Sequence, residues 1–475
     1  MSGRRWILVI GVLLVPFAVH SGELDLRAAQ AKLATNYVGV LSPYARLSFE
    51  LASLFLTVNP DLSKVEPLVR RELGLSQEVS IVEFSDVQAW QISISNSWNF
   101  YLSQTSKAPE SGPFLSLILS HTGRSLGSAS LSASRTGVFR GAQFEYFTSP
   151  GELEKTLTFD EKGNLIVANF FVDLPILSWQ QIYGRNIEDE IPERRIRVGV
   201  IDSGVDYNHP AIARHIPRFT DSSGDLRILG VDLENSDDLP FDLAKHNIAN
   251  HGTSVAGVLV EGAPFIEIVP VVNSELTLDN SVEFLHQNRV RIVNLSQEVS
   301  RDSDQKIRRQ IEDNWVQTIE KFSDVLFVLA AGNDGVDILE AQVRPQSLAF
   351  PNAIVVGALN REGGRASFQY AGSNYNRERV QVVAIGNDIW APVPGGIFSC
   401  MGGTSFAAPQ ITRLAANFSL KNPNWGPHQI IQAIEADAAQ AASADLKTRF
   451  QVTDFFKFGV PPASLGEDST KRCPF

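Results

Sequence analysis

The spacing of apolar residues changes between the first and second parts of this 475-residue chain. Between residues 23 and 75, apolar positions recur every three or four residues, which is the spacing of amphipathic helices. From residue 79 to about 171 the apolar runs are short and strand-like, and Lys162-Gly163-Asn164 has the composition of a hairpin turn. Residues 22–171 therefore predict an α+β N-terminal domain. The helical stretches are 24–38, 43–56 and 63–73.

From residue 195 onward the pattern is different. Apolar runs such as 195–201 and 324–331 are continuous rather than alternating, which predicts strands buried on both faces of a sheet. Helix-like segments such as 305–321 separate these runs, and strands separated by helices predict parallel βαβ crossings. Residues 172–445 therefore predict an α/β domain with a doubly wound, mostly parallel sheet and helices on both faces. Ligands bind such sheets at the carboxyl ends of the strands.

The ends of the chain and the connection between the two domains have their own patterns. Two arginines precede an apolar run at 6–19 that is too short to span a bilayer, so residues 1–21 predict an export signal peptide. We therefore expect a secreted or periplasmic protein with no stable membrane span. Residues 173–194 combine prolines, a glycine and charges, which predicts an exposed linker where proteolytic cuts concentrate. Residues 446–475 form a C-terminal tail.

Composition narrows the range of functions. The formal net charge of -12 lacks the basic footprint of a nucleic-acid-binding protein, so we expect no nucleic-acid partner. The chain has two cysteines, Cys400 and Cys473, which are too few for a disulfide framework. One bridge between them and two separate thiols both stay open.

Three motifs fall where the sheet pattern places chemistry. Asp202 follows an apolar run in VGVIDSGVDYNHP, His251 begins a small-residue helix in NHGTSVAG, and Ser405 follows two glycines in MGGTSFAAP. A serine hydroxyl becomes a nucleophile when a neighbouring base takes its proton, and histidine suits that task near neutral pH. A carboxylate holds the imidazole in the useful tautomer and stabilises its cation. Together these residue types predict nucleophilic catalysis by a serine.

Asn333 adds a fourth candidate. It follows the apolar run of residues 324–331, and its side-chain amide can donate a hydrogen bond to the negative oxygen of a tetrahedral intermediate. The backbone N–H of Ser405, at the start of the next helix, would be the second donor.

The order Asp, His, Ser, with DSG, HGTSVAG, AAGN and GGTSFAAP, resembles the subtilisin-like serine proteases, the subtilase family. The resemblance covers a little over half of the chain. It implies a serine endopeptidase that acts through an acyl-enzyme on Ser405, with Asp202 and His251 completing a catalytic triad. It also implies an oxyanion hole at Asn333. The substrate-binding positions that it implies are Ser296 and Gly332.

The resemblance also bears on ions and substrates. It implies that no cofactor is required, and we assign no residue to a metal site. Structural calcium ions are common in this family, and an acidic loop lies between Asp202 and His251, so a structural calcium ion stays open. The implied partners are protein or peptide substrates. Ser296 matches the family, whereas Gln297 and Glu298 depart from its usual Leu-Gly pair and leave the first specificity pocket undefined.

Two alternative functions follow from the same residues. The first is a catalytically silent subtilisin-like protein that binds a partner, and the presence of all four motif residues disfavours it. The second is a serine esterase of the α/β-hydrolase class, which requires Gly-x-Ser-x-Gly and the order Ser, Asp, His. Residues 22–171 are either the prosegment of a zymogen, acting as inhibitor or folding chaperone of its own peptidase domain, or a permanent accessory domain.

Overall fold

A computed structural model describes most of the chain between residues 24 and 451. The density of contacts divides the chain into two units. The first contains the described residues up to Phe144 together with Phe159–Asn164, and the second contains Glu145–Thr158 and the described residues from Leu165 onward. The described residues are 24–36, 43–57, 59–73, 78–94, 98–105, 114–121, 127–149, 152–244, 250–273, 278–297, 299, 304–368, 371–440 and 450–451.

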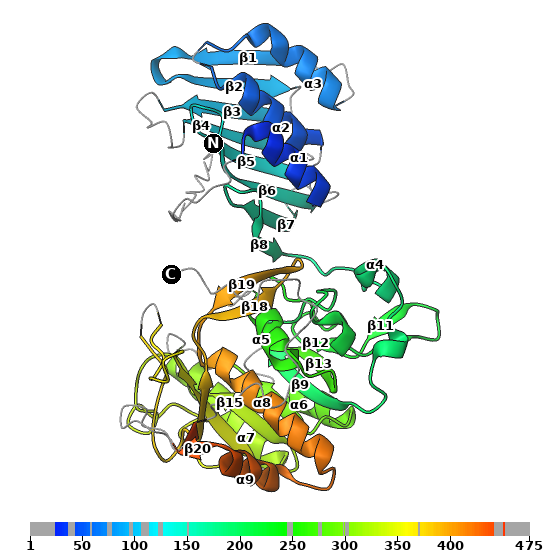
Figure 1. Cartoon of the computed structure of the whole chain (residues 1–475), viewed down its shortest axis with the longest axis vertical. Helices are drawn as coiled ribbons and strands as arrows, with labels where there is room; N and C mark the ends of the chain where they lie inside the picture. The colour runs from blue at the N-terminus through cyan, green and yellow to red at the C-terminus, as the bar shows by residue number, and fades with distance from the viewer. Residues whose placement is uncertain are drawn as a thin grey trace. The chain divides into compact units, whose positions relative to one another are not determined.

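Three helices and a sheet with strands in sequence order form the N-terminal part of the structure (Figure 1). Neighbouring strands from β1 to β5 pair antiparallel. The three predicted helices are confirmed, and β7 and β8 form the predicted hairpin, with Gly163 at a φ of 67° in its turn. The helices are α1 (Leu26–Asn36), α2 (Pro43–Leu54) and α3 (Val65–Leu73). The strands are β1 (Val79–Phe84), β2 (Ala89–Ile94), β3 (Trp98–Gln104), β4 (Leu115–His121), β5 (Gly127–Ala133), β6 (Phe139–Ser149), β7 (Glu152–Phe159) and β8 (Leu165–Phe170).

Alternating burial along these strands builds the core of the first unit. Trp90, Ile92 and Ile94 of β2 are buried, and the residues between them are partly exposed. Phe55, which follows α2, packs edge-on against Trp90 with 5.1 Å between ring centroids. One face of the antiparallel sheet is therefore covered by helices, as the period-two pattern predicts. This confirms the α+β class predicted for the N-terminal part.

The second unit is built on a sheet with the strand order β12-β13-β9-β14-β15-β16-β17-β21-β20. Every pairing from β12 to β21 is parallel, and β20 pairs antiparallel with β21. The strands of this sheet are β9 (Ile196–Asp202), β12 (Val231–Asp232), β13 (Ile266–Val272), β14 (Ile292–Leu295), β15 (Leu326–Ala330), β16 (Ala353–Leu359), β17 (Val382–Ile385), β20 (Ala439–Gln440) and β21 (Phe450–Gln451). Two short antiparallel pairs lie outside it: β10 (Arg218–Thr220) with β11 (Leu226–Ile228), and β18 (Ile389–Val393) with β19 (Ile397–Met401).

The order of the strands determines where a site can form. The chain adds β12 and β13 on one side of β9 and then crosses to add β14 on the other side. A reversal of this kind opens a crevice at the carboxyl ends of the strands beside it. Asp202 ends β9, and Ser296 follows β14. Both residues therefore lie at the reversal.

Helices cover both faces of this sheet. Helices α6 and α7 share one buried cluster with alternate strand residues, including Leu285, Trp315 and Phe327. Helices α5 and α8 pack against each other and against β9, and α8 also contacts β14 to β17. The predicted doubly wound α/β fold is confirmed. No helix among the described residues is both long and apolar enough to cross a membrane. The helices are α4 (Trp179–Tyr183), α5 (His251–Val260), α6 (Leu278–Gln287), α7 (Gln305–Lys321), α8 (Thr404–Lys421) and α9 (Pro427–Asp437).

The segment that the sequence predicts as an exposed linker is folded onto the second unit. Asn208 Nδ2 donates a hydrogen bond to the Pro175 carbonyl at 2.9 Å, and Tyr183 Oη donates to the Pro210 carbonyl at 2.8 Å. Its residues before Gly184 are mostly half-buried. The prolines and charges of this segment are typical of a linker. The prediction misses the packing because the hydrogen-bond partners lie about thirty residues further along the chain, where a local pattern does not reveal them.

Candidate active site

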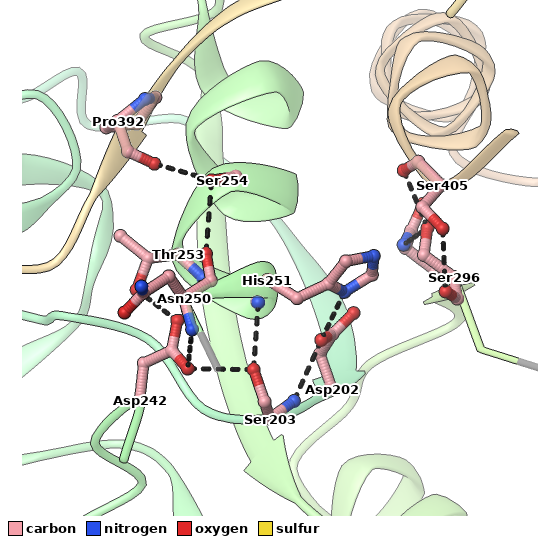
Figure 2. Close-up of polar contacts among 12 residues, drawn as sticks. Asp202, Ser203, Asp242, Asn250, His251, Thr253, Ser254, Ser296, Pro392 and Ser405 are labelled. Atoms are coloured by element: carbon pink, nitrogen blue, oxygen red, sulfur yellow. Dashed lines mark hydrogen bonds and ion pairs between the residues drawn. The ribbon is translucent and has the colours of Figure 1, made fainter. Parts of the chain in front are cut away.

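Asp202 and His251 form a hydrogen-bonded pair at the centre of the sheet edge. Asp202 is the last residue of β9 and is 1% exposed, and His251 is the first residue of α5. The imidazole donates from Nδ1 to Asp202 Oδ1 at 2.8 Å (Figure 2). The Ser203 N–H donates to the same oxygen at 2.8 Å. With Nδ1 as the donor, Nε2 of the neutral ring is the acceptor nitrogen.

Ser405 lies in the first turn of α8 and is 7% exposed. Its Oγ donates a hydrogen bond to the Ser296 carbonyl at 3.1 Å, and the Ser296 hydroxyl donates to the Ser405 carbonyl at 2.9 Å. Figure 2 shows the His251 ring extending towards the side of the view where Ser405 lies. Among the described contacts, no hydrogen bond joins Ser405 to His251. The structure therefore pairs Ser405 with Ser296 and Asp202 with His251.

Asn333 and Gly332 follow β15 and meet the turn before Ser405. Asn333 Oδ1 accepts from the Thr404 N–H at 2.9 Å and from the Thr404 hydroxyl at 3.1 Å. Gly332 has a φ of 96°, which suits glycine, and its N–H donates to Thr404 Oγ1 at 3.1 Å. Because two donors hold the amide oxygen of Asn333, its NH₂ group is oriented away from Thr404.

The helix that starts at His251 is capped from distant parts of the chain. Asn250 precedes it in a left-handed conformation with a φ of 70° and gives no side-chain cap. The Gly252 N–H instead donates to Ser203 Oγ at 3.0 Å, and the Thr253 N–H donates to Asp242 Oδ2 at 2.9 Å. These two side chains satisfy first-turn N–H groups that have no partner within the helix.

Asp242 is a second buried carboxylate behind the pair, and sequence reasoning did not single it out. It is 0% exposed and accepts three more hydrogen bonds, from the Ser203 hydroxyl at 2.8 Å, the Thr253 hydroxyl at 2.6 Å and the Asn250 N–H at 3.1 Å (Figure 2). Asp242 thereby fixes the backbone on both sides of His251.

The two carboxylates shape the electrostatics of His251. Burial alone lowers the pKa of His251, but the charge and hydrogen bond of Asp202, with the charge of Asp242, raise that pKa overall. Burial raises the pKa of Asp242 itself to about 6, and the nearby charge of Asp202 contributes to the rise. The protonated imidazole is therefore favoured by its neighbours, as proton transfer to this ring requires.

The acidic loop contains an interior part and a neutralised surface part. Asp232 is buried and accepts from the Glu234 and Asn235 N–H groups. On the surface, Arg227 pairs with Asp221 at 2.8 Å and with Asp238 at 3.1 Å. No group of metal-ligating side chains is found among the described residues. Asp232, Asp221 and Asp238 each bind groups of the protein itself.

One cysteine of the chain lies in the hairpin that precedes the candidate nucleophile. Cys400 belongs to β19, five positions before Ser405, and it is disulfide-bonded. The other cysteine of the chain, Cys473, lies outside the described residues, as does Glu298 of the candidate specificity pocket.

Comparison with known proteins agrees with this geometry. The family model described as "Subtilase family" matches residues 193–459, which is more than half of the chain. The chain belongs to the subtilase family. This confirms the resemblance drawn from the sequence motifs.

Individual subtilases are similar to this chain at a distance. Subtilisin amylosacchariticus of Bacillus subtilis subsp. amylosacchariticus is 28% identical over 260 residues, covering 51% of this chain and 60% of the relative. Subtilisin of Bacillus pumilus is 27% identical over 266 residues, covering 52% of this chain and 86% of the relative. The solved structure of a cold-adapted subtilisin-like serine proteinase is 22% identical with a TM-score of 0.41, covering 54% of this chain and 88% of that one. This chain therefore spans 60% of the length of the first of these relatives.

Proposed function

We propose that this subtilase is an exported serine endopeptidase in which Ser405 is the nucleophile, His251 the general base and Asp202 its orienting carboxylate. The observation that supports it most is the hydrogen bond of 2.8 Å between His251 Nδ1 and Oδ1 of the buried Asp202. It leaves Nε2 to receive a proton at the edge of the sheet where Ser405 lies in the first turn of α8.

The proposed reaction begins with a rotation of the serine. Ser405 Oγ leaves the Ser296 carbonyl, which is a change between staggered rotamers, and turns to His251 Nε2. Oγ attacks the substrate carbonyl carbon while its proton passes to Nε2. The imidazolium then gives the proton to the leaving amine as the C–N bond breaks. Water repeats the sequence on the acyl-enzyme and releases the acid.

Asn333 and the start of α8 are the proposed oxyanion hole. The Asn333 NH₂ group, held by the two Thr404 donors on its oxygen, and the Ser405 N–H would donate to the tetrahedral oxygen. Ser296 and Gly332 are the proposed substrate-binding positions. Ser296 directly follows β14 and Gly332 lies two residues after β15, and an extended peptide can add its backbone beside strands at such an edge.

Labelling with a serine-reactive fluorophosphonate tests the function. The purified chain should be labelled at Ser405 and should cleave a quenched fluorescent peptide library, and labelling should abolish cleavage. A folded protein that is neither labelled nor active would favour the catalytically silent binding protein instead. A structural calcium ion is not needed for the proposed chemistry. Addition of a calcium chelator tests its separate role in stability.

We further propose that the N-terminal domain is a prosegment that assists folding and inhibits the peptidase. The family match covers residues 193–459 and leaves out the first part of the chain, which supports a separate role for that part. A signal peptide at 1–21 and export to a periplasm or the exterior belong to the same proposal, and N-terminal sequencing of the protein from its host tests both.

If the prosegment proposal holds, the Ser405→Ala protein should accumulate close to full length, and the active wild-type enzyme should appear as a shorter chain. The reason is that maturation would require the enzyme's own nucleophile. Intact mass measurement of both proteins checks this. Full activity in a single uncut chain would favour the permanent accessory domain.

Asp242→Asn is expected to lower kcat about tenfold with little change in KM, because an amide cannot accept all the hydrogen bonds that the carboxylate accepts around His251. The acid limb of kcat/KM should also move to lower pH. The charge of Asp242 raises the pKa of His251, so its loss lets the imidazole stay neutral, and act as a base, at lower pH. Asp238→Asn, an exposed acid of the same loop, is the control and should change neither value. An unchanged acid limb would contradict this account.

A further inference from the structure

The end of β8, which lies outside the family match, contacts the residues that precede His251. The Ala244 N–H donates to the Phe170 carbonyl at 2.6 Å, and Asn250 Nδ2 donates to Asn169 Oδ1 at 3.2 Å. Phe170 packs edge-on against Phe241 with 5.4 Å between ring centroids, and both rings are buried. The end of β8 therefore contacts Phe241, Ala244 and Asn250, which precede α5 in the chain.

The same segment also meets the hairpin that leads to Ser405. Gly395 lies between β18 and β19, and a Cβ placed on it would come within 2.8 Å of the Ala168 Cβ. Gly395 has a φ of 92°, so both its conformation and this close approach require glycine. Ala168 is 0% exposed. The end of β8 therefore contacts both the β18–β19 hairpin and the residues that precede His251.

Beyond β8 the segment is anchored along its length. The Leu177 N–H donates to Asn208 Oδ1 at 2.9 Å, and the Arg218 guanidinium lies 4.5 Å from the centroid of the Trp179 ring. Tyr183 Oη accepts from the Arg214 N–H at 3.2 Å in addition to its bond to Pro210. We call residues 168–183 the strap.

We propose that the strap is a permanent part of the peptidase unit, so that the proposed prosegment ends before Ala168 and not at residue 171, and that Asn169 is a positioning residue for His251. The family match begins at residue 193, so neither the match nor the motifs assign a role to the strap. The catalytic role of Asn169 rests on the proposed function, whereas the contacts of the strap do not depend on that function.

Asn250 connects Asn169 to the catalytic histidine. Asn250 directly precedes His251 and has a left-handed φ of 70°, a conformation that asparagine adopts more readily than most residues other than glycine. Its N–H donates to Asp242, its Nδ2 donates to Asn169, and its Oδ1 has no hydrogen-bond partner among the described residues. Asn169 is therefore the described hydrogen-bond partner of the Asn250 side chain. Losing it removes the side-chain restraint on Asn250 and leaves the start of α5 held by Asp242.

Asn169→Ala in the full chain should lower kcat about tenfold with KM unchanged, because small displacements of a general base slow proton transfer strongly. Asn169→Asp keeps an acceptor for Asn250 Nδ2 and should restore kcat to near the wild-type value. Tyr183→Phe removes a contact at the far end of the strap and should lower the melting temperature without changing kcat. Ile166→Ala, on the exposed side of β8, should change neither quantity.

A spectroscopic readout makes the test independent of turnover. The proton shared between His251 Nδ1 and Asp202 should give a downfield NMR resonance in the Ser405→Ala protein, and His251→Gln should remove it and so assign it. Added Asn169→Ala should broaden or shift this resonance, whereas added Tyr183→Phe should not. If wild-type protein is inactive and unlabelled, the proposed function fails, and this resonance still decides the role of the strap.

Two results would overturn the inference. One is an Asn169→Ala protein with reduced melting temperature but unchanged kcat and an unchanged resonance, which is what a merely structural contact gives. The other is a fully active mature enzyme that begins after Tyr183 and has lost the strap. We expect any new N-terminus of the mature enzyme to lie before Ala168.

Discussion

Ser405→Ala is expected to reduce peptidase activity by about six orders of magnitude, to the rate that binding and the oxyanion hole alone support. The variant lacks the atom that we propose forms the acyl-enzyme, and among the described residues the hydroxyl hydrogen-bonds to the Ser296 carbonyl alone, so alanine leaves a single acceptor without its donor. Folding should be retained, as the melting temperature and circular dichroism will show. Cleavage of a fluorescent peptide, corrected for contaminating proteases by fluorophosphonate treatment, measures the loss.

His251→Ala should lose activity to a similar degree, and the double variant should be scarcely worse than either single one. Residues that act as a unit are strongly non-additive, because each is useless without the other. Ser419→Ala, a serine on the same helix, is the matched control and should keep wild-type turnover. Normal turnover in folded Ser405→Ala protein would mean that the nucleophile has been assigned to the wrong residue.

Asn333→Ala should lower kcat by about 10²–10³ with little change in KM, the range reported for loss of one oxyanion-hole donor in subtilisin. A donor aimed at the developing negative charge binds the transition state more strongly than the substrate carbonyl. Steady-state kinetics with one peptide substrate give both constants.

Asn333→Ala also removes the acceptor of two hydrogen bonds, because Asn333 Oδ1 accepts from both the N–H and the hydroxyl of Thr404. The variant could therefore disturb the turn before Ser405. Fluorophosphonate titration should therefore confirm the same concentration of active sites in the variant and in the wild type. Asn186→Ala, an exposed asparagine outside the site, serves as the control. A raised KM with normal kcat would make Asn333 a substrate-binding residue instead.

The positions of the candidate residues along the chain could be predicted because each follows a strong local signal. Asp202 and Asn333 come directly after continuous apolar runs, and such runs form the interior strands of the sheet. The predicted helix at 305–321 is α7 at the same bounds. Local periodicity and strand order together fix which edge of the sheet carries the polar side chains.

Asp242 could not be predicted, because its environment comes from elsewhere in the chain. Its neighbours in sequence include many acids, which predicts a solvated loop. Its actual partners are Ser203, at the end of β9, and Thr253, in α5, and together with burial they make it an interior group. The sequence also does not predict the rotamer of Ser405, whose Oγ donates to the Ser296 carbonyl and not to His251. No sequence pattern specifies a side-chain rotamer.

The part of a chain that resembles a family need not contain every residue that its folded unit requires. The environment of Arg218 is an example. Its Nη1 donates to the Ala213 carbonyl at 2.6 Å and its Nε to the Leu177 carbonyl at 3.3 Å, while its charge faces the Trp179 ring. Burial among neutral acceptors lowers the pKa of Arg218 to about 10. A protein fragment that begins where the family match starts, at residue 193, would lack the Trp179 ring and the Leu177 carbonyl. The buried Arg218 guanidinium would then lose both of these partners. For this chain, the alignment and the packing therefore place the first residue of the peptidase at different positions.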